Sequence, residues 1–236
     1  IETLLNGQWD DGMIPHILFH EKDTSYFPNH TTWQCGKNIP SSGITQPPVL
    51  ASILRKIVEK NQLSNEQHSR IVNIITKIKN YHDWFIKFRD PNKTGLVSIL
   101  HPWESGYDNS PIWDQPMSNI KVDKNLNYKR RDLEVSNSDE RPLKTDYDRY
   151  VTLRDQFRDV QYDPHKLYEI SDFNIADVGF NALFLRANKD LLSLAKNFDL
   201  NFDDLNNFVS KTENEILKLY DDNINNFVSK DLKTNL

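Results

Sequence analysis

The chain has 236 residues, of which 37% are hydrophobic and 27% are charged, a composition typical of a globular protein with a packed core. The 29 basic and 34 acidic residues give a net charge of −5, and the basic residues are scattered along the chain, so nucleic acid is not an expected partner. No run of apolar residues approaches the roughly 18 that a membrane span needs, so no membrane partner is expected either.

The start of the chain is apolar, with Ile1, Leu4 and Leu5, and the first residue is not Met. We therefore expect that the true N-terminus, with any signal peptide, lies upstream. Cys35 is the single cysteine, which excludes an intrachain disulfide and fits a reducing compartment. On this ground we expect a cytoplasmic location.

Two amphipathic helices are predicted in the first half of the chain. In residues 47–61, apolar residues recur at spacings of three and four behind a double proline, which predicts a helix. Ser64 and Gln67 then form a capping box, and one apolar face continues until Asp90-Pro91 ends the second helix.

A long segment from about Asn92 to Thr145 lacks sustained periodicity, so we predict a loop, and a loop of this length in a compact domain usually carries function. Helical patterning returns at 146–160, 171–198 and 202–219, and residues 221–236 are predicted to form a turn and a short extended piece. Helix pairs with almost no strands predict an all-α fold, either a toroid, a bundle or a solenoid. About five or six helices are too few to close a double ring. We therefore expect one domain, 1–236, that is part of a larger fold.

Two Trp, one Tyr and three carboxylates are concentrated between His101 and Asp114. Sugar rings stack their C–H faces on aromatic rings and offer hydroxyls to carboxylates, so this mixture is typical of a pyranose site. A carboxyl group surrounded by aromatic rings also has a raised pKa, as a general acid requires, because burial disfavours the charged form. Composition leaves one alternative open, a loop whose Trp side chains are buried in the core and whose Asp side chains cap turns.

Other classes of site are disfavoured. His16 and His20, with Glu21 beside them, have no third metal ligand at a diagnostic spacing, and the loop that begins at Asp90 lacks the bidentate Glu of an EF-hand, so no metal is expected. Ser105 does not lie in a Gly-x-Ser-x-Gly elbow, and no glycine-rich loop could hold a nucleotide phosphate. Arg141 and Arg149 place guanidinium groups just past the long loop, where they could hold an anionic substrate group or could pair with neighbouring acids.

Five motifs together resemble the bacterial and archaeal branch of glycoside hydrolase family 63, which includes mannosylglycerate and glucosylglycerate hydrolases. They are Gly12-Met13-Ile14-Pro15-His16, Gly43-Ile44-Thr45-Gln46-Pro47-Pro48, Gly95-Leu96-Val97 leading to His101-Pro102-Trp103-Glu104-Ser105-Gly106-Tyr107-Asp108-Asn109-Ser110-Pro111, Tyr147-Asp148-Arg149-Tyr150, and Asp177-Val178-Gly179-Phe180-Asn181-Ala182. The motifs occur in the family's order over nearly the whole chain. Trehalases of a neighbouring family carry a similar Trp-Glu-Ser-Gly-x-Asp core on the same barrel.

The resemblance implies an (α/α)6 barrel, incomplete in this chain, and hydrolysis with inversion by two carboxylates, without cofactor or metal. Asp108 matches the family's general acid. The general base is a Glu in a later motif that has no match here, so we expect the base and the closing helices outside these residues, and we expect the isolated chain to be inactive. Gln46, Trp103, Tyr107 and Arg141 match positions that line the substrate pocket, and Arg141 is the expected partner of a glycerate carboxylate.

The expected partner is therefore a small carbohydrate substrate, and the expected reaction is cleavage of an α-glycosidic bond in glucosylglycerate or mannosylglycerate. One alternative is a trehalase-like or α-glucosidase activity on disaccharides. The alternative from another class is a helical scaffold that binds proteins or sugars without catalysis.

Overall fold

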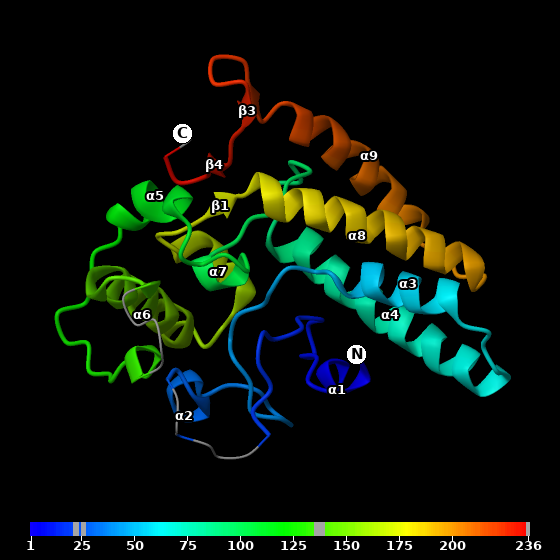
Figure 1. The fold of residues 1–236 in the computed structure, drawn as a ribbon, viewed down its shortest axis with the longest axis horizontal. Coiled ribbons are helices and arrows are strands. Elements are labelled where there is room, and N and C mark those ends of the chain that lie inside the picture. Colours follow the sequence, from blue (N-terminus) through cyan, green and yellow to red (C-terminus); the bar gives the residue numbers. More distant parts are fainter. Residues whose placement is uncertain (21–23, 25–26, 135–139, 235–236) are drawn as a thin grey trace. The chain divides into compact units, whose positions relative to one another are not determined.

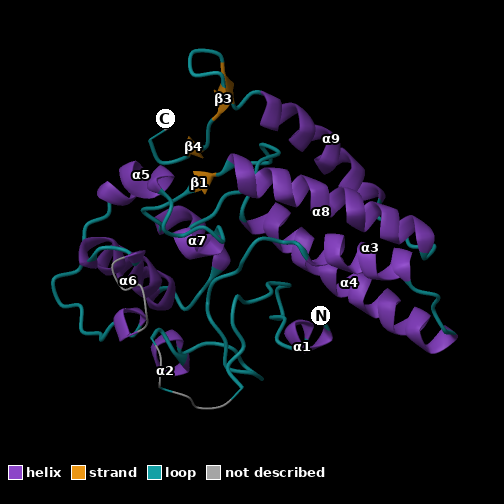
Figure 2. Cartoon of the chain, in the orientation of Figure 1, coloured by secondary structure: helices purple, strands orange, loops and turns teal. Residues whose placement is uncertain are grey.

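The computed structural model describes residues 1–20, 24, 27–134 and 140–234. By their contacts the residues divide into two compact units, each of which is assembled from separate stretches of sequence. Unit 1 comprises Ile1–Ile14, Pro47–Ser98 and Ile175–Leu236, and unit 2 comprises Pro15–Gln46 and Ile99–Asn174. The described residues are mostly helical (Figures 1 and 2). None of the described helices has both the length and the apolar character that crossing a membrane requires.

Unit 1 contains four long helices, one short helix and four two-residue strands among its described residues. They are α1 (Glu2–Leu5), α3 (Leu50–Lys60), α4 (Asn65–Phe88), β1 (Ile175–Ala176), α8 (Val178–Asn197), α9 (Asp203–Leu217), β2 (Tyr220–Asp221), β3 (Asn226–Phe227) and β4 (Lys230–Asp231). Helix α8 contacts α3, α4 and α9, and Figure 1 shows these four helices side by side. The strands form two antiparallel pairs, β1 with β4 and β2 with β3.

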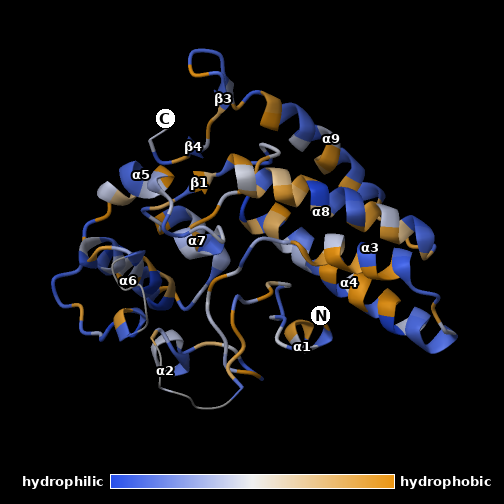
Figure 3. Ribbon diagram, viewed as in Figure 1, coloured by the Kyte–Doolittle hydropathy of each residue, from blue (hydrophilic) through white to orange (hydrophobic). Residues whose placement is uncertain are grey.

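The core of unit 1 follows from the amphipathic pattern of its helices. Along α4 and α8, hydrophobic residues alternate with hydrophilic ones (Figure 3), and the hydrophobic faces are buried. Phe85 of α4 contacts the rings of Phe180 and Phe184 of α8, with centroid distances of 5.5 and 5.2 Å. Such aromatic pairs add to the stabilisation that comes from removing their surface from water.

Polar side chains of α8 connect it to other parts of unit 1. The buried carboxylate of Asp190 accepts hydrogen bonds from Ser52 (2.6 Å) and Arg55 (2.7 Å) of α3. The buried amide of Asn181 accepts from the N–H of Val97 (2.9 Å) and donates to its carbonyl (2.8 Å). These contacts fix α3 and the segment around Val97 against α8.

Unit 2 has less regular structure. Its described helices are α2 (His30–Trp33), α5 (Asp114–Ser118), α6 (Lys144–Asp159), α7 (Pro164–Ile170) and the 3-10 helices η1 (Pro102–Glu104), η2 (Pro111–Trp113) and η3 (Asp132–Glu134). The segment predicted as a long loop is irregular apart from η1, η2, α5, η3 and the first residues of α6, and its residues 135–139 lie outside the described part of the chain. Figure 2 shows this segment mostly as loop.

Four of the five predicted helices are confirmed as α3, α4, α6 and α9, and the C-terminal turn with extended pieces is confirmed as β2 to β4. The capping box is present, since Ser64 Oγ accepts from the N–H of Gln67 (3.3 Å) and the Gln67 side chain accepts from the N–H of Ser64 (2.9 Å). The prediction that a helix begins at Ser171 is wrong. Helix α8 begins at Val178 behind an Asp177 N-cap, because β1 pairs with β4 just before it, and α7 was not predicted.

Candidate active site

Residues 101–114 of unit 2 form the loop that carries Asp108, and local hydrogen bonds determine its conformation. His101 caps η1, because its Nδ1 accepts the N–H of Trp103 at 3.0 Å. Ser105 Oγ then donates to the carbonyl of Pro102 (2.6 Å) and accepts from the N–H of Tyr107 (3.0 Å). Gly106 follows with a φ of +81°, a left-handed conformation that favours glycine. The result is a tight turn that leads into a second turn, closed by the N–H of Ser110 and the carbonyl of Tyr107 (3.1 Å), in which Asp108 lies.

The three carboxylates of this loop lie in different environments. Glu104 is fully buried, and its oxygens accept the N–H groups of Leu100 (2.8 Å) and Thr45 (3.4 Å). Asp114 is exposed at the start of α5. Asp108 is half-buried. Of the three, Asp108 therefore combines access for a substrate with partial removal from water.

Aromatic rings cluster in this loop and in the neighbouring helix α6. The half-buried ring of Trp103 lies 5.6 Å from that of Tyr150 and 6.1 Å from that of Tyr147, between centroids. Tyr107, also half-buried, stacks on Trp113 with a centroid distance of 5.5 Å and an interplanar angle of 16°. Trp113 is buried and donates its indole N–H to the carbonyl of Tyr107 (3.0 Å), so it belongs to the core and supports the loop from below the surface.

The negative charge of Asp108 acts on the neighbouring groups. Burial and then the charge of Asp108 raise the pKa of Tyr150. Solvent reaches the side chain of His16, but the surrounding protein atoms lower the pKa of its imidazole, although the charges of Asp108 and Glu104 oppose that shift. The electrostatic environment of the loop therefore includes His16, which lies in the first of the five motifs that resemble the family.

Gln46 and Arg141 lie in the same unit as the loop. Gln46 is half-buried and follows Thr45, whose N–H is bonded to Glu104. Arg141 is exposed, and it follows Glu140, whose carbonyl accepts a hydrogen bond from the Asn109 amide (3.4 Å). Each of them is one residue away from a contact to the loop. Their roles in substrate binding, like those of Trp103 and Tyr107, stay predictions.

Among the described residues, no group of three or more His, Cys, Asp or Glu side chains could hold a metal ion. Glu21, next to His20, lies outside the described residues. The carboxylate of Asp90 closes its own turn by accepting the N–H groups of Thr94 (2.6 Å) and Gly95 (2.7 Å). Arg149 pairs with Asp146 at 3.0 Å, which fits the pairing with neighbouring acids that the sequence left open for this guanidinium.

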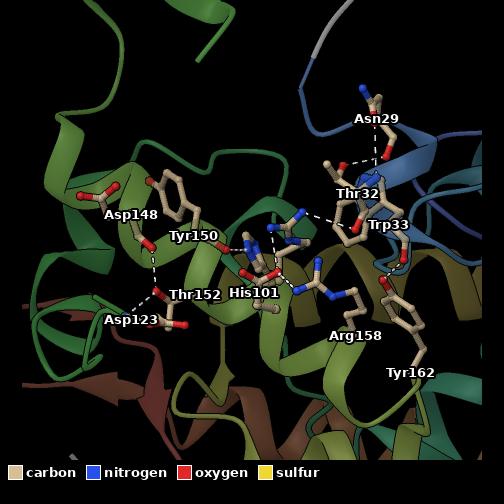
Figure 4. Close-up of polar contacts among 12 residues, drawn as sticks. Asn29, Thr32, Trp33, His101, Asp123, Asp148, Tyr150, Thr152, Arg158 and Tyr162 are labelled. Atoms are coloured by element: carbon tan, nitrogen blue, oxygen red, sulfur yellow. Dashed lines mark hydrogen bonds and ion pairs between the residues drawn. The ribbon is translucent and has the colours of Figure 1, made fainter. Parts of the chain in front are cut away.

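Sequence reasoning gave no role to His101, and it used Tyr150 as part of a motif without a role. Figure 4 shows the imidazole of His101 next to the backbone of Tyr150 in α6. His101 Nε2 lies 3.0 Å from the carbonyl oxygen of Tyr150, and the hydroxyl of Tyr150 donates to the carbonyl of Asp108 at 2.8 Å. The sequence held one local signal for the role of His101. It stands directly before Pro102, and a polar side chain before a proline that begins a helix is a typical helix cap.

The chain is similar to proteins of known activity. Residues 1–236 match the family model of the mannosylglycerate hydrolase MGH1-like glycoside hydrolase domain. The chain is 48% identical over 191 residues to a mannosylglycerate hydrolase of Thermus thermophilus, covering 80% of this chain and 46% of that protein. It is 33% identical over 211 residues to a glucosylglycerate hydrolase of Mycolicibacterium hassiacum, covering 84% of this chain and 47% of that protein.

A solved structure confirms the fold class. The crystal structure of a family 63 mannosylglycerate hydrolase from Thermus thermophilus, in complex with Tris and D-glycerate, matches 99% of this chain with a TM-score of 0.93 and 42% identity. The match covers 56% of that protein, so the chain spans about half the length of the relatives it matches and has the fold of part of an (α/α)6 barrel. The chain therefore belongs to glycoside hydrolase family 63, as a member of the mannosylglycerate hydrolase MGH1-like domains.

Proposed function

We propose that the protein to which this chain belongs hydrolyses the α-glycosidic bond of a glycerate-linked sugar such as mannosylglycerate or glucosylglycerate, with Asp108 as the general acid. One observation carries this proposal. Asp108 is the half-buried carboxylate of the loop that also carries the half-buried Trp103 and Tyr107, while Glu104 is fully buried and held by backbone N–H groups. A proton donor in hydrolysis needs both contact with the substrate and partial removal from water.

In the proposed reaction, Asp108 gives its proton to the oxygen between the sugar and glycerate as the bond from that oxygen to the anomeric carbon breaks. A water molecule attacks the anomeric carbon from the opposite face and gives its proton to a second carboxylate, so the configuration is inverted. In inverting enzymes the two carboxyl groups are roughly 6.5 to 9.5 Å apart, which leaves room for that water. We propose that the second carboxylate is a Glu outside residues 1–236.

The substrate class is supported by the relatives, since the named activities are mannosylglycerate and glucosylglycerate hydrolysis and a similar crystal structure holds D-glycerate. We propose that Trp103 and Tyr107 offer ring faces to the sugar, which stacks its C–H groups on them. Gln46 is proposed to bind sugar hydroxyls. Arg141, exposed and always charged, is proposed to pair with the carboxylate of glycerate.

The test uses the full-length protein with mannosylglycerate, glucosylglycerate and trehalose at equal concentrations. Hydrolysis and the anomer released first are followed by proton NMR. We expect the glycerate-linked substrates to be cleaved faster than trehalose, with the β-anomer of the free sugar appearing before mutarotation. Preferential cleavage of trehalose would favour the disaccharide alternative, the α-anomer as first product would exclude inversion, and no hydrolysis of any substrate would favour the binding scaffold.

A further inference from the structure

Both ends of the short segment from Trp103 to Asp108 are connected to one residue of α6. At the Asp108 end, the hydroxyl of Tyr150 donates to the backbone carbonyl of Asp108 at 2.8 Å. At the Trp103 end, the imidazole of His101 bridges the N–H of Trp103 (3.0 Å) and the backbone carbonyl of Tyr150 (3.0 Å). Figure 4 shows the contact between His101 and Tyr150. Tyr150 therefore holds the segment through its hydroxyl and through its main chain.

The bonds of His101 determine its tautomer. A backbone N–H can only donate, so Nδ1, which faces the N–H of Trp103, must carry a lone pair. The proton of the neutral ring is therefore on Nε2, where it points at the carbonyl of Tyr150. Burial lowers the pKa of His101 to about 3, so the ring stays neutral above this pH and both of its nitrogens are used. His101 is thus a neutral connector between the loop and α6.

We infer that Tyr150 and His101 are positioning residues that hold the carboxyl group of Asp108 at the glycosidic oxygen. This inference rests on the proposed function of Asp108. A proton donor must come within about 2.6 to 3.2 Å of the atom that it protonates. Asp108 lies in a turn, outside any helix or strand, so these two tertiary hydrogen bonds supply the position that regular structure does not. Neither residue is proposed to contact the substrate.

The position of the general acid affects the rate of hydrolysis only where the leaving group needs a proton. A glycerate leaving group needs a proton as the bond breaks, whereas fluoride leaves a glycosyl fluoride without needing one. A displaced acid should therefore slow the natural glycoside and spare the fluoride. General loss of folded protein would slow both substrates alike.

The experiment is the substitution Tyr150→Phe in the full-length protein, with kcat and KM measured on mannosylglycerate and on α-mannosyl fluoride. The ring and its contact with Trp103 stay, and the hydroxyl that holds Asp108 is lost. Since a displacement of about 1 Å in an active site can lower a rate about a hundredfold, we expect kcat on mannosylglycerate to fall about ten- to a hundredfold. We expect the KM to change little and the rate on the fluoride to stay close to that of the unmodified protein.

Tyr162→Phe is the matched control. Tyr162 is also buried in unit 2, and its hydroxyl also donates to a backbone carbonyl, that of Trp33 at the end of α2, instead of to a carbonyl of the loop. The control should keep the unmodified ratio of the two rates. His101→Asn is a second variant, because Asn can cap η1 but is too short to reach Tyr150 as well, and it should show the same selective loss as Tyr150→Phe even where the latter fails to fold.

Equal effects on both substrates, or an unchanged rate on mannosylglycerate, in a folded Tyr150→Phe or His101→Asn protein would overturn the inference. Asp108→Asn, measured in parallel, separates this result from the proposed function. If Asp108→Asn loses the natural substrate while both positioning variants keep the unmodified ratio, only the inference fails. If Asp108→Asn keeps normal turnover, the role of Asp108 as acid fails and the inference fails with it.

Discussion

From the buried side chain of His82 we predict how the stability of unit 1 depends on pH. The side chain is fully buried between α4 and α8, where its Nδ1 lies 2.7 Å from the Oδ1 of Asn188 and its ring contacts Phe184 at a centroid distance of 5.2 Å. The carbonyl oxygen of Asn188 accepts, so Nδ1 carries the proton. The other nitrogen, Nε2, is buried without a hydrogen-bond partner in the structure. Protonation of Nε2 would bury a charge and an unpaired N–H donor.

The magnitude follows from the pKa. Burial lowers the pKa of His82 from 6.5 to about 4. Above pH 6.5 the ring is neutral in both the folded and the unfolded chain, so it contributes no pH dependence. As the pH falls from 6.5 to 4, the unfolded chain binds a proton that the folded chain does not, and stability is lost. At 1.36 kcal/mol per pKa unit, the total loss is about 3 kcal/mol, complete below pH 4.

The assay is urea unfolding of the full-length protein at about pH 7 and about pH 4.5, with the free energy of unfolding extrapolated to water. In His82→Leu the absolute stability changes because the bond to Asn188 is lost. The quantity to compare is therefore the change in the free energy of unfolding of each protein between the two pH values. The unmodified protein should lose about 2 to 3 kcal/mol more between them than His82→Leu does. His68→Leu, an exposed site on the same helix, should behave like the unmodified protein. An equal loss in His82→Leu and the unmodified protein would refute this account of the buried ring.

Two further substitutions test the packing that supports each unit. Asp190→Asn should lower the free energy of unfolding, measured by chemical denaturation, by about 2 kcal/mol, because Arg55 and Arg186 lose their buried carboxylate partner. The loss is no larger because both Arg side chains are partly exposed, so water solvates their charges. Gly43→Ala should destabilise unit 2 by about 1 to 3 kcal/mol, because a Cβ at this position would lie 2.0 Å from a ring carbon of Tyr162. A free energy of unfolding equal to that of the unmodified protein in either variant would contradict the role given to the corresponding contact.

Local patterns were sufficient for the long helices. Helix α4 was predicted from Ser64, Gln67 and one apolar face, and the structure contains both the capping box and the buried face. The start of α8 was missed because the residues before it are held by pairing with β4, near the other end of the sequence, which no local window contains. Helix α7 was missed because its seven residues show little periodicity, although Asp163-Pro164 is a typical helix start.

The sequence predicted which segment carries the candidate site. It did not predict which carboxylate of that segment is buried or which of its residues contact α6. The motif indicated Asp108 but could not distinguish it from Glu104 by burial, because Glu104 is held by Thr45, 59 residues away. The roles of His101 and Tyr150 depend likewise on contacts between the loop and α6. Residue types predict which chemistry is available, and the tertiary contacts decide which of several carboxylates can perform it.

The most direct measurement is the turnover of mannosylglycerate by Asp108→Asn in the full-length protein, beside the unmodified protein and with folding checked by circular dichroism. Asn has nearly the same size but cannot give a proton to the leaving oxygen. Since general acid catalysis contributes about a hundred- to ten-thousandfold, kcat should fall by a factor in this range while the rate on α-mannosyl fluoride falls far less. A folded Asp108→Asn protein that hydrolyses mannosylglycerate at the unmodified rate would contradict the assignment of Asp108 as the acid.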